Sequence, residues 1–83
     1  MSGSLRVRFR EERHAVALAD ELAGLGPTEV SRDRLAWEVS IDDLQTRWFL
    51  VSALDAVRRT LRGQPSVTAE VVVNGDTYRL RGE

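Results

Sequence analysis

The fold is decided near the beginning of the chain by the stretch Leu5-Arg6-Val7-Arg8-Phe9-Arg10, in which apolar residues and arginines alternate. Successive side chains of a β-strand point to opposite faces. A period of two therefore sends the three apolar residues into a core and the three arginines to the other face. We expect an antiparallel sheet with one packed face and one charged face.

Spacing predicts the elements that follow this strand. Apolar residues separated by three and four positions are typical of a helix, and strict alternation is typical of a strand. An aspartate suits the N-terminus of a helix, where its carboxylate accepts hydrogen bonds from free backbone N–H groups. The expected elements are a helix over 11–25, strands over 28–31 and 35–41, and a second helix from Asp42 or Asp43 to about Arg62.

The C-terminal part of the chain is predicted to form a β-hairpin. Asn74-Gly75 is a pair that a two-residue type I′ turn favours, because both turn residues need a positive φ. Apolar residues then meet on one face of the hairpin and opposite charges on the other. Counting outward from the turn pairs Val73 with Asp76, Val71 with Tyr78, Glu70 with Arg79, and Ala69 with Leu80.

These elements follow the order βαββαβ, with one extra C-terminal hairpin strand. We expect an α+β fold of the ferredoxin-like, split βαβ type, in which two helices cover one face of an antiparallel sheet. The first strand is then central. Its residues Arg6 and Arg8 are expected to lie between Glu38 on one neighbouring strand and Glu70 on the other.

This order of strands and helices resembles that of ACT-type modules, which are small domains that sense amino acids and usually form dimers. The resemblance implies a regulatory domain that binds a small ligand. ACT-type modules have a glycine-bearing loop between the first strand and the first helix, where the effector lies. This chain has Phe9-Arg10-Glu11-Glu12 at that junction, so no binding residue is carried over from the family.

Length and composition limit the domain organisation and the cellular compartment. The 83 residues leave room for one core, so we expect residues 1–4 to be a flexible lead and residues 5–83 to be a single α+β domain. No apolar run approaches the roughly 20 residues of a membrane span, and residues 1–4 lack the layout of a secretion signal. We expect a cytoplasmic protein.

The charge balance and the aromatic residues argue against nucleic-acid binding. All twelve basic residues are arginine, and thirteen acidic residues bring the net charge to −1. A nucleic-acid binder usually has a basic excess, and many stack bases on exposed aromatic rings. Phe9 and Tyr78 share the phase of the core residues, so both are expected to point inward. Weak nucleic-acid binding is kept as a second alternative.

Candidates for catalysis or metal binding are few. The chain has no cysteine, which excludes disulfides and thiolate-bound zinc. His14 is the only histidine, and Glu11 lies one turn before it, which is typical of a pair on a helix surface. We expect no enzyme activity, no metal and no cofactor.

The second helix is expected to carry two apolar stripes. The larger one faces the core and consists of Leu50, Ala53, Leu54, Val57 and Leu61. At about 100° per residue, Trp48 lies roughly 150° from the centre of that stripe. Leu44, Trp48 and Val51 follow one another at i, i+4 and i+7 and form a second apolar seam. An exposed tryptophan of this kind is typical of an interface anchor; the alternative is local packing of Trp48 over the preceding loop or over Gln64 and Pro65.

Two functions remain open. The first is a small non-enzymatic protein-interaction or regulatory module, which binds a second copy or another protein through the apolar seam or the charged face of the sheet. The second is an ACT-like regulatory domain that binds a small anionic ligand through Arg6, Arg8 and Arg79. The same three arginines are also candidates for contact with a partner protein.

Overall fold

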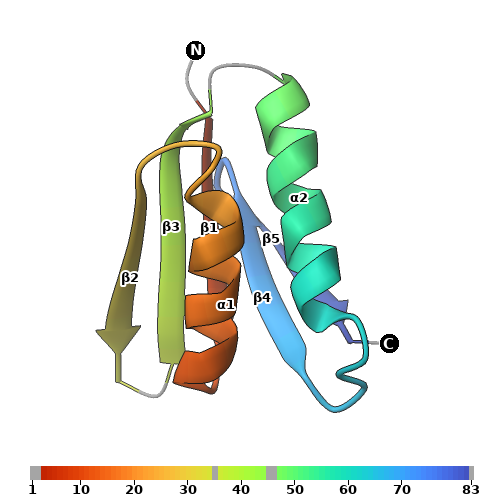
Figure 1. Ribbon diagram of the computed structural model, residues 1–83. Helices are drawn as coiled ribbons and strands as arrows, with labels where there is room; N and C mark the ends of the chain where they lie inside the picture. The colour runs from red at the N-terminus through yellow and green to blue at the C-terminus, as the bar shows by residue number, and fades with distance from the viewer. Residues whose placement is uncertain (1–2, 35, 45–46, 83) are drawn as a thin grey trace.

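The computed structural model describes residues 3–34, 36–44 and 47–82, and it shows an α+β fold with a five-stranded antiparallel sheet. Both helices lie on one face of the sheet (Figure 1). The elements are β1 (Gly3–Phe9), α1 (Glu12–Leu22), β2 (Thr28–Asp33), β3 (Ala36–Leu44), α2 (Arg47–Leu61), β4 (Thr68–Val73) and β5 (Asp76–Arg81).

The strand order is β2-β3-β1-β4-β5, so β1 is the central strand. It pairs antiparallel with β3 on one side and with β4 on the other, as the sequence predicts. Val7 lies opposite Val39 and Val71 in the two neighbours. The register therefore places apolar residues beside apolar residues across the three central strands, on the face that the helices cover.

The core lies between this face and the two helices. Leu5, Val7 and Phe9 are fully or almost fully buried, which confirms the alternation of the first strand. Each helix adds one stripe: α1 contributes Ala15, Leu18 and Leu22, and α2 contributes Ala53, Ala56, Val57 and Leu61. The alanines bring each helix axis close to its neighbours, so a thin domain still forms a continuous apolar cluster.

The predicted hairpin is confirmed in all four residue pairs. Its turn residues, Asn74 and Gly75, have φ values of 49° and 91°. The expected burial of Tyr78 is wrong. Its register partner is the buried Val71, so it lies on the helix-covered side, but β5 is an edge strand and the ring is exposed.

The predicted start of the second helix is also wrong. Asp42 and Asp43 lie in β3, which continues to Leu44, and α2 begins at Arg47. The cause is a longer β1, which begins at Gly3 and pairs that residue with Leu44. Backbone pairing therefore holds in a strand the residues that would otherwise cap a helix.

The expected flexible lead over residues 1–4 is wrong for its last two residues, because Gly3 and Ser4 belong to β1. The Ser4 backbone N–H donates a hydrogen bond to Oδ1 of Asn74 at 3.1 Å. Asn74 thus combines two roles, since it supplies a positive φ to the turn and fixes the beginning of the central strand. Residues 1 and 2 lie outside the described part of the chain.

Trp37 is half-buried against the core rather than enclosed by it. It is opposite Arg32 of the edge strand β2, whose guanidinium carbon lies 5.7 Å from the centre of the ring. A cation over an aromatic face is attractive, so Arg32 covers the side of the ring that the core leaves open. Leu35, the first residue of the predicted strand over 35–41, lies outside the described residues.

Gly82, the residue after β5, packs closely against the segment between α2 and β4. Its N–H donates a hydrogen bond to the carbonyl of Val67 at 2.8 Å. A Cβ at this position would lie 1.7 Å from the carbonyl oxygen of Gln64, which is less than any real contact allows. The close approach between the end of β5 and the turn after α2 therefore requires glycine.

We predict that Gly82→Ala lowers the free energy of unfolding by about 1–3 kcal/mol, because the added methyl group must displace backbone. Urea denaturation of the variant and the wild type measures the difference. Gly24→Ala is the matched control. A Cβ there meets nothing within 4 Å, and we expect stability to be unchanged or raised by up to about 1 kcal/mol. Equal stability of Gly82→Ala and the wild type would contradict the contact.

Candidate interaction surface

The open face of the sheet carries a row of alternating charges. Glu38 on β3, Arg8 on β1, Glu70 on β4 and Arg79 on β5 lie opposite one another across four strands. Nη1 of Arg8 donates a hydrogen bond to Oε1 of Glu70 at 3.3 Å. Nε of Arg6 lies 3.8 Å from Oε1 of Glu38. The expected placement between the two glutamates is confirmed for Arg8, whereas Arg6 lies opposite Ser40 and Val72 and approaches only Glu38.

This pairing determines what the open face can bind. The structure brings the three candidate anion contacts, Arg6, Arg8 and Arg79, to one face, but Glu70 lies between Arg8 and Arg79, and Glu38 lies beside Arg6 and Arg8. An anion would have to compete with Glu38 and Glu70 for the same guanidinium groups. The face is therefore a lattice of compensated charges, which is stable in water without a ligand.

The outer face of the helices is different, because it exposes apolar side chains. Trp48 is 73% exposed and Val51 is 53% exposed, one turn apart on the side of α2 that faces away from the sheet. The Trp48 side chain therefore lies mostly in solvent. Leu44 does not belong to the helical seam, since it lies in β3.

The apolar residues of α2 border a hollow that α1 completes. Its volume is about 460 Å³, and the segment after α1 contributes Gly24 and Leu25 to its wall. The charged residues on the rim are Glu21, Asp55 and Arg59. Arg59 donates to Asp55 on its own helix and, at 3.1 Å, to Glu21 on α1, so this arginine ties the two helices together.

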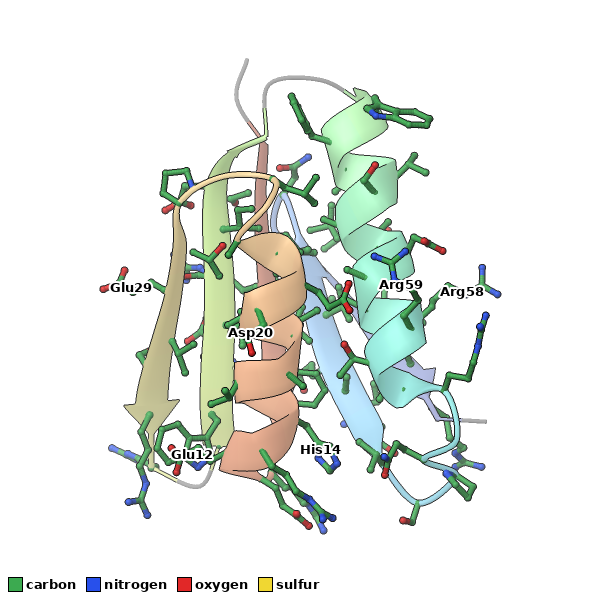
Figure 2. The ribbon with its side chains drawn as sticks, in the orientation of Figure 1. Glu12, His14, Asp20, Glu29, Arg58 and Arg59 are labelled. Atoms are coloured by element: carbon green, nitrogen blue, oxygen red, sulfur yellow. The ribbon has the colours of Figure 1, made fainter. Side chains whose placement is uncertain are left out.

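The outer side of α1 carries a smaller apolar patch that the sequence analysis missed. Val16 is 43% exposed, beside Ala17. Glu12, Val16 and Asp20 follow one another at intervals of four, so they form one stripe along the helix. The spacing in the sequence could have indicated that Val16 lies on the exposed side of α1, because it shares a stripe with two acidic residues. Figure 2 shows Glu12 and Asp20 on α1, and Arg58 and Arg59 on α2.

His14 has a structural environment. It is only 7% exposed, and its ring lies 6.1 Å from that of Phe9. The expected surface pair with Glu11 is wrong, because Glu11 instead forms an ion pair with Arg13 at 2.7 Å. In the described ranges, no three His, Asp or Glu side chains are grouped as ligands for a metal.

Comparison of the chain with protein-family models, with curated proteins and with solved structures gives no match. Neither α1 nor α2, the two helices of the described ranges, has the length and apolar content needed to cross a bilayer. The chemistry of the two faces is therefore the basis for inferring a function.

We predict that Arg8→Ala lowers the free energy of unfolding by about 1 kcal/mol at low salt, because Glu38 and Glu70 then flank an uncharged position. Added salt should reduce the loss, since it screens the repulsion between the two carboxylates. Urea denaturation at two salt concentrations measures both effects.

Arg81→Ala is the control for this prediction, because Arg81 shares the open face and forms no ion pair with another described residue. We expect its stability to stay close to that of the wild type. If Arg8→Ala and Arg81→Ala have equal effects, the charge lattice does not stabilise the sheet.

Proposed function

We propose that this chain is a small non-enzymatic interaction module that associates with a second copy of itself through the outer face of its helices. The observation that carries the proposal is the exposure of Trp48 together with Val51. Tryptophan leaves a large apolar area in water when it is exposed, and it is enriched at the centres of protein interfaces. Its position beside a hollow gives a partner side chain a place to insert.

The small size of the domain favours a second copy as the partner at this face. A domain of this length buries only about 60% of the surface that its unfolded chain exposes, so association adds apolar burial that the fold alone lacks. The molecule measures 34 × 26 × 23 Å. Its helical face is of the size needed for the about 800 Å² per partner that a stable interface buries.

We further infer that the fold is the split βαβ, ferredoxin-like arrangement, extended by β5 at one edge. The support is the antiparallel pairing of β1 with both β3 and β4, with a helix between β1 and β2 and another between β3 and β4. In such a fold one sheet face stays uncovered. The charge lattice makes that face compatible with water, which leaves the helical face as the apolar surface available to a partner.

The alternative functions have less support. Binding of a small anion by an ACT-like domain requires arginines that are free to meet it, whereas Arg8 is hydrogen-bonded to Glu70 and Arg6 lies beside Glu38. Nucleic-acid binding through the open face requires aromatic rings there. Phe9 is buried on the opposite side, and Tyr78 lies on the helix-covered side of β5.

We predict that the wild type shows a concentration-dependent mass in analytical ultracentrifugation, and that Trp48→Ala shifts the dissociation constant upward at least tenfold. A tryptophan anchor contributes about 2 kcal/mol or more to an interface, which corresponds to this factor. Circular dichroism should show that the fold of the variant is unchanged, because Trp48 lies outside the core.

Tyr78→Ala is the matched control, since Tyr78 is an exposed aromatic residue on β5 rather than on a helix. It should associate like the wild type. A wild type that stays monomeric at every concentration would disprove self-association. Equal weakening by both substitutions would place the interface elsewhere.

A further inference from the structure

Charge is segregated between the two helices. The segment 11–22, which comprises α1 and its N-cap residue, has four acidic residues and one arginine. The segment 47–62, which comprises α2 and the residue after it, has four arginines and one aspartate. Figure 2 shows Glu12 and Asp20 on α1 and Arg58 and Arg59 on α2, with Arg58 projecting on the side of α2 away from α1. The helical layer is thus acidic on one side and basic on the other.

Part of this charge is already neutralised within the molecule and part of it is available. Arg59 is engaged by Asp55 and Glu21. Within the described residues, Glu12 and Asp20 on α1, and Arg58 and Arg62 at the end of α2, form no ion pair. All four of these side chains are exposed.

The available charges lie beside the exposed apolar residues. Asp20 is one turn after Val16 on α1. On α2, Arg58 follows Val51 by seven positions, so helical periodicity puts both on the same side of the helix, and Arg62 comes directly after the helix. Arg58 and Arg62 border β5, beside Leu80 and Arg81. Each helix therefore presents an apolar patch next to unpaired charge of one sign.

Symmetry leaves two simple ways to place this layer against its own copy. Both two-fold axes lie in the plane of the interface. An axis perpendicular to the helices in this plane puts α1 on α1 and α2 on α2, so like charges meet at both contacts. A two-fold axis parallel to the helices exchanges their positions and puts α1 on α2 twice, so opposite charges meet at both contacts. Like charges opposed across an interface are unfavourable, which selects the second arrangement.

The directions of the helices fit that arrangement. Figure 1 shows that α1 and α2 run in opposite directions, with the first turn of α1 and the last turn of α2 at the same end of the sheet. The Glu12 end of one copy then meets the Arg62 end of the other. The Trp48 end of α2 meets the C-terminal end of the partner's α1, which is the end that forms the wall of the hollow.

We infer that two copies pair about an axis parallel to the helices, with the acidic α1 of each copy against the basic α2 of the other. This arrangement rests on the proposed self-association and adds to it the partner's surface and a dependence on salt. These contacts place the exposed Val16 of one copy toward the Arg62 end of the partner's α2, and the exposed Val51 toward the C-terminal end of the partner's α1 (Figure 1).

Charge reversal tests the arrangement. An acidic variant, Arg58→Glu with Arg62→Glu, makes both helices acidic, and a basic variant, Glu12→Arg with Asp20→Arg, makes both helices basic. Each variant alone should associate at least tenfold more weakly than the wild type. A mixture of the two in equal amounts should restore a dimer, because each contact then joins opposite charges. Sedimentation of the single variants and of the mixture measures this.

The control is Arg79→Glu with Arg81→Glu, a reversal of the same size on the open face of the sheet, which should leave association unchanged. Thermal unfolding followed by circular dichroism shows whether each variant is folded. A second measurement needs no variant: the dissociation constant of the wild type should rise several-fold between about 0.05 M and about 0.5 M salt.

The outcomes separate the two proposals. A wild type that is monomeric at all concentrations defeats the self-association itself. A wild-type dimer that ignores salt and charge reversal overturns only the arrangement. A dimer that becomes tighter when the acidic variant is mixed with the wild type also overturns it, because that result indicates contact of α2 with α2.

Discussion

The central strand β1 has to satisfy both faces of the sheet at once, and the rest of the fold depends on how it does so. Its odd-numbered residues Leu5, Val7 and Phe9 are enclosed by the helices and by the apolar residues of β3 and β4. Its arginines lie on the uncovered face, where a lone positive charge would lack a partner. Glu38 of β3 and Glu70 of β4 stand at the register positions on either side of Arg8 and supply one. A slip by one residue would reverse both faces, so this strand determines the register of its neighbours.

The features that could be predicted from the sequence are those with a local period. The alternation in β1, the Asn74-Gly75 turn and the core stripe of α2 each involve residues close together in the chain, and the structure confirms them. The outward direction of Trp48 follows from the same helical period. The sequence therefore predicts the central strand, the register of the hairpin and the α2 side of the candidate surface.

The features that could not be predicted depend on contacts between distant segments. Asp42 and Asp43 have the local chemistry of a helix cap, but Gly3 at the other end of the chain extends the sheet past them. Gly82 is required because the turn after α2 passes close by, which no local pattern indicates. Tyr78 has the phase of a core residue, yet its strand has only one neighbour. In each case, tertiary placement overrides a correct local tendency.

The asymmetry between the two faces connects the fold with the proposed function. One face pairs Arg6 and Arg8 with glutamates of the neighbouring strands, while the other leaves apolar area and unpaired charge on two helices of opposite sign. A surface of the first kind gains little from a partner. A surface of the second kind gains both apolar burial and charge complementarity when it meets its own copy.

The most direct measurement is a nitrogen–proton NMR spectrum recorded over a series of protein concentrations. Trp37 and Trp48 give the two indole N–H signals, and Trp48→Phe assigns them. Association through the helical face predicts that dilution shifts the Trp48 signal together with the amide signals around Val16 and Asp20, while the Trp37 signal stays in place. Shifts confined to Trp37 and to the strands of the open face, or no shift at all, would contradict association through the helical face.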